Sequence, residues 1–230
     1  MHVTRPTRIS ALRFFVIGLA ALLGLPGDAS GAIWINEIHY DNAGTDSGEF
    51  VELVVGPGMS ISDATLYLYN GDDQQLYNSG STFSGGSFTL GSMSNGFSIY
   101  SLSLPVNGLQ NGPSDGLALE VSGSIVQFLS YEGSFTADGG PADGLTSVDI
   151  GVAESSSTVV GASLSLIGTG SAYADFTWAV TNVSSAGATP GGVNNGQTLV
   201  RPSAGAVPEA TSLVVWASLA VGALLVRKRG

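Results

Sequence analysis

The chain has 230 residues, a formal net charge of −11 and no cysteine. Without cysteine, neither disulfides nor thiolate metal sites are available, so an exported fold would depend on its hydrophobic core. All seven basic residues lie near the two ends, and only two of the 18 acidic residues lie there with them. The body, residues 33–200, therefore has 16 carboxylates and no Lys or Arg. That excludes the basic surface which nucleic-acid binding needs, and leaves cations and neutral polymers as better candidate partners.

The first 32 residues have the pattern of a secretory signal peptide. Three arginines precede an apolar run at residues 14–25, and small residues follow at 29–32. This order of charged region, apolar region and small-residue cleavage zone predicts cleavage after Ala32. The alternative is a first transmembrane helix, which needs closer to 20 apolar residues and leaves the small-residue run unexplained.

The last 30 residues, 201–230, predict a short membrane-spanning helix followed by a basic tail. The apolar run extends from Leu213 to Val226, includes Trp216, and ends at Arg227, Lys228 and Arg229. At about 1.5 Å per residue it spans roughly 20 Å, less than a hydrocarbon core of about 30 Å. The basic cluster is expected to stay cytoplasmic, which places the body on the far side of the membrane.

This ending resembles the PEP-CTERM sorting signal of Gram-negative bacteria. Here the motif is Val207-Pro208-Glu209-Ala210, with alanine in place of the second proline. The resemblance implies recognition by an exosortase. The protein would be anchored transiently in the inner membrane with its body in the periplasm, then processed and released to the cell surface or an exopolysaccharide matrix. A plain tail anchor is the alternative.

The body predicts about eight β-strands. Runs rich in β-branched and aromatic residues recur between glycine-containing breaks, without a helical period between them. This pattern favours an all-β fold, a mainly antiparallel β-sandwich, in one domain of residues 33–200. The predicted strands are residues 33–38, 50–55, 64–69, 97–104, 117–121, 125–131, 163–167 and 176–180.

Turn and loop signals complete the predicted sandwich. Alternation at residues 117–121, then Ser122-Gly123-Ser124 and a second apolar run, predicts a hairpin. Residues 70–86 and 133–144 are rich in Gly, Ser, Asp and Asn, and are predicted to be exposed loops.

Two segments of the body resemble the lamin-tail domain. Residues 35–41 (INEIHYD) and 46–53 (DSGEFVEL) are similar to its first two strands, and residues 176–178 (FTW) with 188–194 (ATPGGVN) to the ending of bacterial members. The resemblance implies an immunoglobulin-like β-sandwich. Val54-Val55 replaces the usual asparagine after the second strand, and the middle of the chain diverges from the family. Fold alone does not imply function.

Catalytic groups are scarce in the body. His39 is its one histidine, no G-x-S-x-G motif occurs, and Lys, Arg and Cys are absent. His39 beside Asp41 is expected to be a surface residue. Paired carboxylates would suit a hydrolase, with candidates Glu37, Glu49, Glu52 and Glu132. We expect instead a non-enzymatic surface or matrix protein with an interaction or structural role, and no cofactor.

A calcium-dependent glycan-binding module is the alternative function. Calcium takes several carboxylate and carbonyl oxygens, and two loops are candidate sites for it. Among the aromatic residues, Tyr77 is predicted to lie in a loop where it could stack on a sugar, whereas Trp34 and Trp178 are predicted to pack in the core. The candidate calcium ligands are Asp41, Asn42, Asp46 and Glu49 in the first loop and Asp138 and Asp143 in the second.

Overall fold

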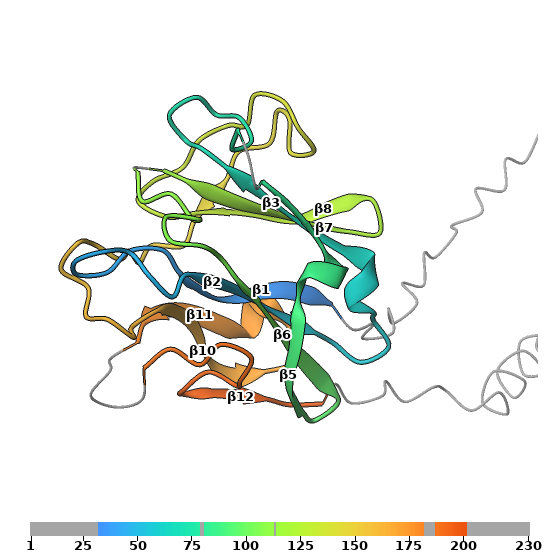
Figure 1. Cartoon of the computed structure of the whole chain (residues 1–230). Helices are drawn as coiled ribbons and strands as arrows, with labels where there is room; N and C mark the ends of the chain where they lie inside the picture. Colours follow the sequence, from blue (N-terminus) through green and yellow to red (C-terminus); the bar gives the residue numbers. More distant parts are fainter. Residues whose placement is uncertain (1–31, 79–80, 113, 182–186, 202–230) are drawn as a thin grey trace, which may run out of the picture.

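A computed structural model describes residues 32–78, 81–112, 114–181 and 187–201 (Figure 1). The predicted signal peptide and the C-terminal sorting segment with its membrane helix lie outside these ranges. Within them, no helix is long and apolar enough to cross a bilayer. The helices there are three single 3₁₀ turns at Ile61–Asp63, Gly85–Ser87 and Tyr173–Asp175.

The strands form two packed sheets, as Figure 1 shows. The seven-stranded sheet has the order β11-β10-β1-β2-β6-β5, and β12 pairs in parallel with the second half of β10. Its strands are β1 (Ile33–His39), β2 (Phe50–Val55), β5 (Thr89–Ser94), β6 (Phe97–Ser103), β10 (Leu164–Gly170), β11 (Phe176–Val180) and β12 (Gln197–Leu199).

The five-stranded sheet has the order β4-β3-β7-β8-β9. All its pairs are antiparallel except β8–β9. Its strands are β3 (Ala64–Tyr69), β4 (Thr82–Ser84), β7 (Gly116–Val121), β8 (Ser124–Ser130) and β9 (Val148–Asp149).

All eight predicted strands are present, three with the predicted bounds and five with ends shifted by one to three residues, and the all-β sandwich is confirmed. The predicted hairpin is β7–β8. Its turn residues Ser122 and Gly123 have φ values of 51° and 82°. Positive φ at both positions defines the type of two-residue turn that matches the twist of paired strands.

Four further strands were not predicted: β4, β5, β9 and β12. The expectation of a loop throughout residues 70–86 was therefore wrong at Thr82–Ser84, where β4 pairs with β3. These strands are short or rich in Gly and Ser, so their side chains carry little of the alternation that marks a strand. Residues 133–144 contain no strand, as predicted, although Ala137 and Ala142 are buried.

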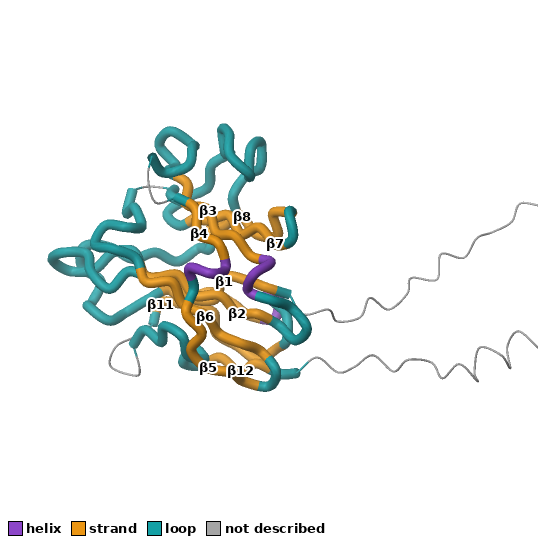
Figure 2. Tube along the Cα trace, turned by 45° about the vertical axis from the view of Figure 1, so that its right-hand side comes forward, coloured by secondary structure: helices purple, strands orange, loops and turns teal. Residues whose placement is uncertain are grey.

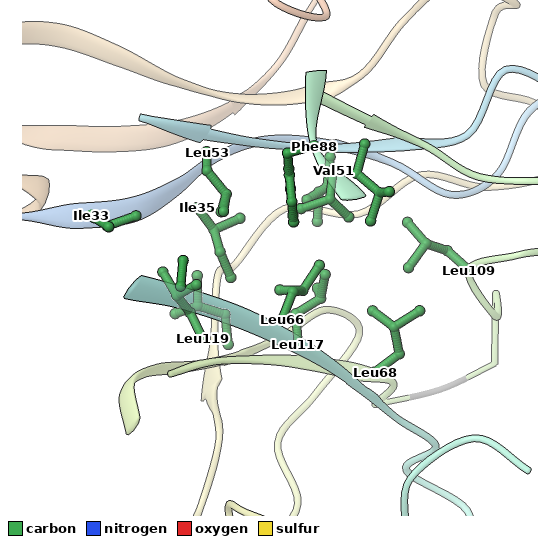
Figure 3. Packing of buried hydrophobic residues seen from close by; sticks show 14 of the residues in the cluster. Ile33, Ile35, Val51, Leu53, Leu66, Leu68, Phe88, Leu109, Leu117 and Leu119 are labelled. Carbon is green, nitrogen blue, oxygen red and sulfur yellow. The ribbon is translucent and has the colours of Figure 1, made fainter. Parts of the chain in front are cut away.

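The main core lies between the sheets. Figure 3 shows Ile33, Ile35, Val51 and Leu53 from one sheet facing leucines of the other. Alternate residues of a strand point to opposite faces, so β1 and β2 also present an outer set of side chains. The leucines that complete this core from the second sheet are Leu66, Leu68, Leu117 and Leu119.

Both outer faces of the sandwich carry a smaller core of their own. On the seven-stranded sheet, Trp34, Val54, Ile99 and Leu166 cluster with Leu199 of β12. On the other sheet, the loop after β8 covers a second cluster, Tyr69, Ala118, Phe128, Phe135, Ala137 and Ala142. Each sheet is therefore buried on two faces over part of its area.

The two ends of the described body lie at one end of the sandwich, where both grey traces leave it in Figure 2. Ala32 accepts a backbone hydrogen bond from Gly56. The carbonyl of Leu199 accepts a hydrogen bond from the side-chain amide of Asn95, in the turn between β5 and β6. The loops after β1, β3 and β6 project from the opposite end.

Leu66→Ala should lower the free energy of unfolding by about 2–5 kcal/mol, because it opens a cavity in the inter-sheet core. Leu66 is fully buried, whereas Leu90 on the edge strand β5 is 49% exposed. Leu90→Ala is the matched control and should change stability by less than about 0.5 kcal/mol. Urea denaturation measures both, and equal losses for the two variants would contradict the assigned core.

Candidate functional site

A β-bulge in β1 brings polar side chains to the outer face of the seven-stranded sheet. The register with β2 shifts between Ile35 and Glu37, so β1 has one extra residue opposite β2. Ile35 and Ile38 both stay in the inter-sheet core. Asn36 and Glu37 instead contact side chains on the outer face.

Glu37 holds the segment that leads into β12. Its carboxylate accepts hydrogen bonds from the Thr189 backbone N–H at 3.0 Å and the Thr189 hydroxyl at 2.9 Å. The Ser163 hydroxyl donates a further bond to it. Glu37 is fully buried, so this contact ties β1 to a turn 152 residues later.

Glu52 on β2 holds the same segment two residues further on. Its carboxylate accepts from the Gly191 backbone N–H at 2.7 Å and from the Asn36 amide at 2.8 Å. Asn194 adds two bonds, from its amide to the carbonyls of Asn36 and Leu166, both at 3.0 Å. We call Glu37 and Glu52, with Thr189 and Gly191, the carboxylate clamp.

The clamped turn also touches the edge strand β5. The Ser92 N–H donates to the Gly191 carbonyl at 2.7 Å. A Cβ at Gly91 would lie 2.1 Å from that carbonyl oxygen, so only glycine allows this approach. The segment at residues 189–194 therefore bridges β1, β2, β5 and β10.

Burial and mutual repulsion raise the pKa of the clamp carboxyls. For Glu52, burial and then the charge of Glu37 raise the pKa to about 9, although hydrogen bonds from Asn36, Gly191 and Gly192 oppose the shift. Burial also raises the pKa of Glu37, against the hydrogen bonds of Ser163 and Thr189. Because two adjacent buried carboxylates repel, one of them holds a proton at neutral pH.

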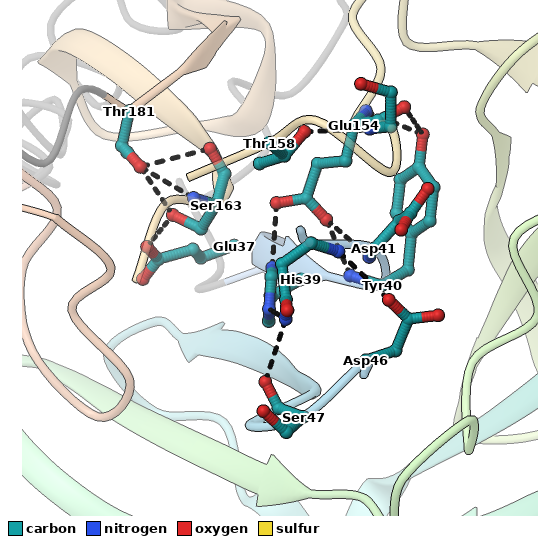
Figure 4. A network of polar contacts seen from close by, with 12 residues as sticks. Glu37, His39, Tyr40, Asp41, Asp46, Ser47, Glu154, Thr158, Ser163 and Thr181 are labelled. Carbon is teal, nitrogen blue, oxygen red and sulfur yellow. Dashed lines mark hydrogen bonds and ion pairs between the residues drawn. The ribbon is translucent and has the colours of Figure 1, made fainter. Parts of the chain in front are cut away.

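A second polar network, drawn in Figure 4, lies at the end of β1. His39 Nδ1 lies 2.8 Å from Glu154 Oε1. The other oxygen of Glu154 accepts the backbone N–H groups of Tyr40 at 2.6 Å and Asp41 at 3.0 Å. Tyr40 in turn stacks on Tyr131, with 3.9 Å between ring centroids.

The expectation that His39 is a surface residue beside Asp41 was wrong. Its side chain is buried and pairs with Glu154, 115 residues away. Burial lowers the pKa of His39, but the hydrogen bond and charge of Glu154, with smaller contributions from Ser47 and Glu49, raise it above its ordinary value. Its Nε2 lies 2.9 Å from the Asn42 amide rather than beside a hydroxyl nucleophile.

The structure brings together part of the first predicted calcium loop. Asp46 accepts from the Asn42 N–H and from the Asn111 amide, both at 3.1 Å. Burial, then the bond and charge of Asp46, raises the pKa of Asp41 to about 6. Glu49 points elsewhere, accepting from the Leu109 N–H at 2.6 Å.

The second predicted calcium loop is separate from the first. Asp143 accepts from the Gly139 N–H at 2.8 Å, and Asp138 is linked through its backbone to Gln74. Over the described parts of the chain, no three His, Asp or Glu side chains are grouped so that they could hold a metal ion. The six candidate ligands do not form one site.

The candidate catalytic carboxylates are distributed over three places. Glu37 and Glu52 are fully buried in the clamp, Glu49 is bound to the loop after β6, and Glu132 accepts from the Tyr40 hydroxyl at 2.9 Å. None of them lines the cavity that the structure contains. A carboxylate pair facing a cleft, which the hydrolase alternative requires, is not found among these four residues.

That cavity has a volume of about 480 Å³ and lies between β4 and the segment that follows β6. Tyr77 lines it and lies in a loop, as predicted, but the residue is only 7% exposed, so its ring is not free to stack on a sugar. Trp34 is buried and Trp178 half-buried, so both pack as predicted. The cavity is also lined by Asn78, Phe83, Pro105, Asn107 and Gln110.

Comparison of the chain with protein-family models, curated proteins and solved structures found no match. The geometry of the described residues defines a mostly antiparallel β-sandwich. Two buried carboxyl groups, Glu37 and Glu52, hold its C-terminal segment on an outer face.

The clamp predicts that stability falls as pH rises. A carboxyl group whose folded pKa exceeds its unfolded value favours folding fully below the unfolded pKa and loses that contribution as pH rises through the folded pKa. For Glu52 the interval runs from 4.5 to about 9. Differential scanning calorimetry should therefore give a higher midpoint at pH 5 than at pH 8.5.

Glu52→Gln should reduce the fall of the midpoint between pH 5 and pH 8.5, because glutamine does not ionise. At pH 5 the variant should be less stable than the original chain by about 1–3 kcal/mol, because the NH2 of its amide cannot accept the hydrogen bond of Asn36 or of Gly191. Glu120→Gln, at a half-exposed site on β7, is the control. The control should leave the slope of stability against pH unchanged. If Glu52→Gln also leaves it unchanged, Glu52 is not the source of the slope.

The His39–Glu154 pair predicts an elevated histidine pKa. In an NMR titration His39 should titrate above its ordinary pKa, and Glu154→Gln should lower the pKa of His39 because it removes the negative charge beside the ring. Glutamine retains an acceptor for the backbone N–H groups but loses the charge. His2, the other histidine of the unprocessed chain, is the internal control. An unchanged His39 pKa in the variant would contradict the pairing.

Proposed function

We propose that this chain is an exported, lamin-tail-like protein with an immunoglobulin-like body, and that it has an interaction or structural role without catalysis. An exosortase of a Gram-negative cell would read its C-terminal signal. The body would reach the periplasm, anchored by the C-terminal helix, and then the cell surface or an exopolysaccharide matrix. Its partners there would be matrix polysaccharide or surface proteins.

The observation that carries the proposal is the carboxylate clamp. The lamin-tail resemblance rests on residues 35–41 and 46–53 near the start of the body, and on residues 176–178 and 188–194 near its end. Glu37 and Glu52 near the start bind the backbone N–H groups of Thr189 and Gly191 near the end. The two segments that carry the resemblance are thus joined by hydrogen bonds, which supports assigning both of them to one domain.

The distribution of ionisable groups supports a role without catalysis. Glu37, Glu49 and Glu52 are buried against backbone N–H groups. Glu132 is exposed and accepts from the Tyr40 hydroxyl, while the buried His39 lies between Glu154 and the Asn42 amide. Proton transfer requires a group within hydrogen-bonding reach of a bound substrate. The lining of the cavity includes no carboxylate and no histidine.

The arrangement of chain ends suits a body attached through its C-terminus. Residues 32 and 201 lie at one end of the sandwich, so a membrane-attached tail would hold the opposite loops away from the bilayer. Binding residues are commonly placed on such loops. The cavity and the His39–Glu154 network both lie toward the end of the sandwich that carries these loops, opposite the chain ends.

Intact-mass analysis of protein extracted from the surface of a Gram-negative host with an exosortase tests the delivery. The expected chain begins at Ile33 and lacks residues 213–230, because both sorting segments are removed. Surface protein that still carries residues 213–230 would contradict processing and favour the plain tail anchor.

A double variant, Pro208→Ala with Glu209→Ala, tests whether the motif is read. It should keep its tail and remain in the membrane fraction, with at least about tenfold less protein at the surface. Ser203→Ala, outside the motif, is the control and should be processed normally. Equal surface delivery of the two variants would contradict recognition of the motif.

A further inference from the structure

The cavity lies at the open side of the sandwich, where the edge strand β4 of one sheet faces the segment after β6 of the other. Phe83 on β4 pairs with Leu66 of β3, and Leu104 and Pro105 directly follow β6. Its volume of about 480 Å³ is within the range of about 300–1,000 Å³ that is typical of ligand pockets. No part of the carboxylate clamp lines it.

The lining combines aromatic surface with unused amides. Tyr77 and Phe83 supply rings, and Pro105 adds apolar surface. Asn78, Asn107 and Gln110 supply side-chain amides that make no hydrogen bond within the described residues. Each amide offers two N–H donors and a carbonyl acceptor, a set that pairs well with hydroxyl groups.

The wall of the cavity is fixed before any ligand binds. The Tyr77 hydroxyl accepts from the Gln110 N–H at 3.0 Å, and the Tyr77 N–H donates to the Leu68 carbonyl at 3.1 Å. From behind, the buried Tyr131 hydroxyl donates to the Gln110 carbonyl at 2.5 Å. A preformed wall reduces the entropy lost on binding.

The charges around the cavity select against anions. Glu49 lies directly behind the wall, bound to the Leu109 N–H, and Asp115 lies near Tyr77. The body has no Lys or Arg to offset them. An anionic ligand would be repelled, while a cation would find no carboxylate oxygen in the lining.

We infer that this cavity binds a segment of a neutral polysaccharide. A sugar ring has an apolar C–H face, which fits the accessible apolar surface of Phe83 and Pro105, and hydroxyl edges, which fit the three amides. The inference deepens the proposed interaction role and rests on it, because it names the class of matrix polymer that the body would hold. Binding should not need calcium, since the lining has no carboxylate.

Isothermal titration calorimetry on the purified full chain in detergent tests the inference. The probes are maltohexaose, cellohexaose and chitohexaose, with hexagalacturonate as the charged comparison and EDTA in a parallel series. At least one neutral hexasaccharide should bind with a Kd of about 1 mM or tighter, unaffected by EDTA. No neutral binding, tighter binding of hexagalacturonate, or loss of binding in EDTA would each overturn the inference.

A double variant locates the site. Asn78→Ala with Gln110→Ala should weaken binding at least about tenfold, because it removes two side-chain amides that make no hydrogen bond to another described residue. Gln75→Ala, in the same loop but outside the lining, is the control and should bind as the original chain does. Unchanged affinity in the double variant would overturn the assignment.

Hydrogen exchange on the unmodified chain gives a second measurement that does not depend on a variant folding. Bound saccharide should slow amide exchange in peptides covering residues 74–78 and 104–110, and protection confined to other regions would overturn the site. These measurements use purified protein, so their failure leaves the sorting proposal standing. Conversely, a retained tail on cells leaves the binding result unaffected.

Discussion

The fold depends on two carboxyl groups that lie where a hydrophobic core would ordinarily exclude them. Glu37 and Glu52 are fully buried, yet neither is paired with a cation. Their oxygens are satisfied by backbone N–H groups and hydroxyls of a segment far along the chain. Burying a polar group is costly unless it is hydrogen-bonded, so these contacts require the segment at residues 189–194 to be in place.

The same solution recurs elsewhere in the body. Glu49 is bound to the loop after β6, Glu154 to the chain after β1, and Asp115 to the N–H groups of Gly71 and Gly112. Each buried carboxylate fixes a loop by accepting backbone donors. In a chain whose body lacks Lys and Arg, acidic side chains thus order irregular segments by accepting backbone N–H groups rather than by pairing with Lys or Arg. Some of the acidic residues therefore stabilise the fold, and others make the surface negatively charged.

The sequence predicted the strands with strong alternation and missed those without it. Val, Ile, Leu and aromatic residues mark β1, β2 and β7 clearly, whereas Thr89–Ser94 reads as a loop because its pairing rests on backbone bonds. The bulge at Asn36 was not predictable from periodicity, because the extra residue reverses which face of the sheet each later residue of β1 points to. His39 and Glu154 meet only through the fold, so no local pattern indicates their pairing. Tyr77 lies in a loop as predicted, but its burial was not predictable from the sequence, because the core residues that cover it come from other parts of the chain.

The parallel pairing of β12 with β10 has a mechanical consequence. Its three registered residues precede the exit of the chain at residue 201, and the clamp lies directly before them. Tension applied through the C-terminus would act along β12 and load its hydrogen bonds together in shear, rather than peel them one at a time. If they failed, the load would pass to Gly191 and Thr189 at the clamp. The C-terminal end of the body is thus held by two sets of hydrogen bonds, the β12–β10 pairing and the clamp, and both must break before a pulling force acts on the inter-sheet core.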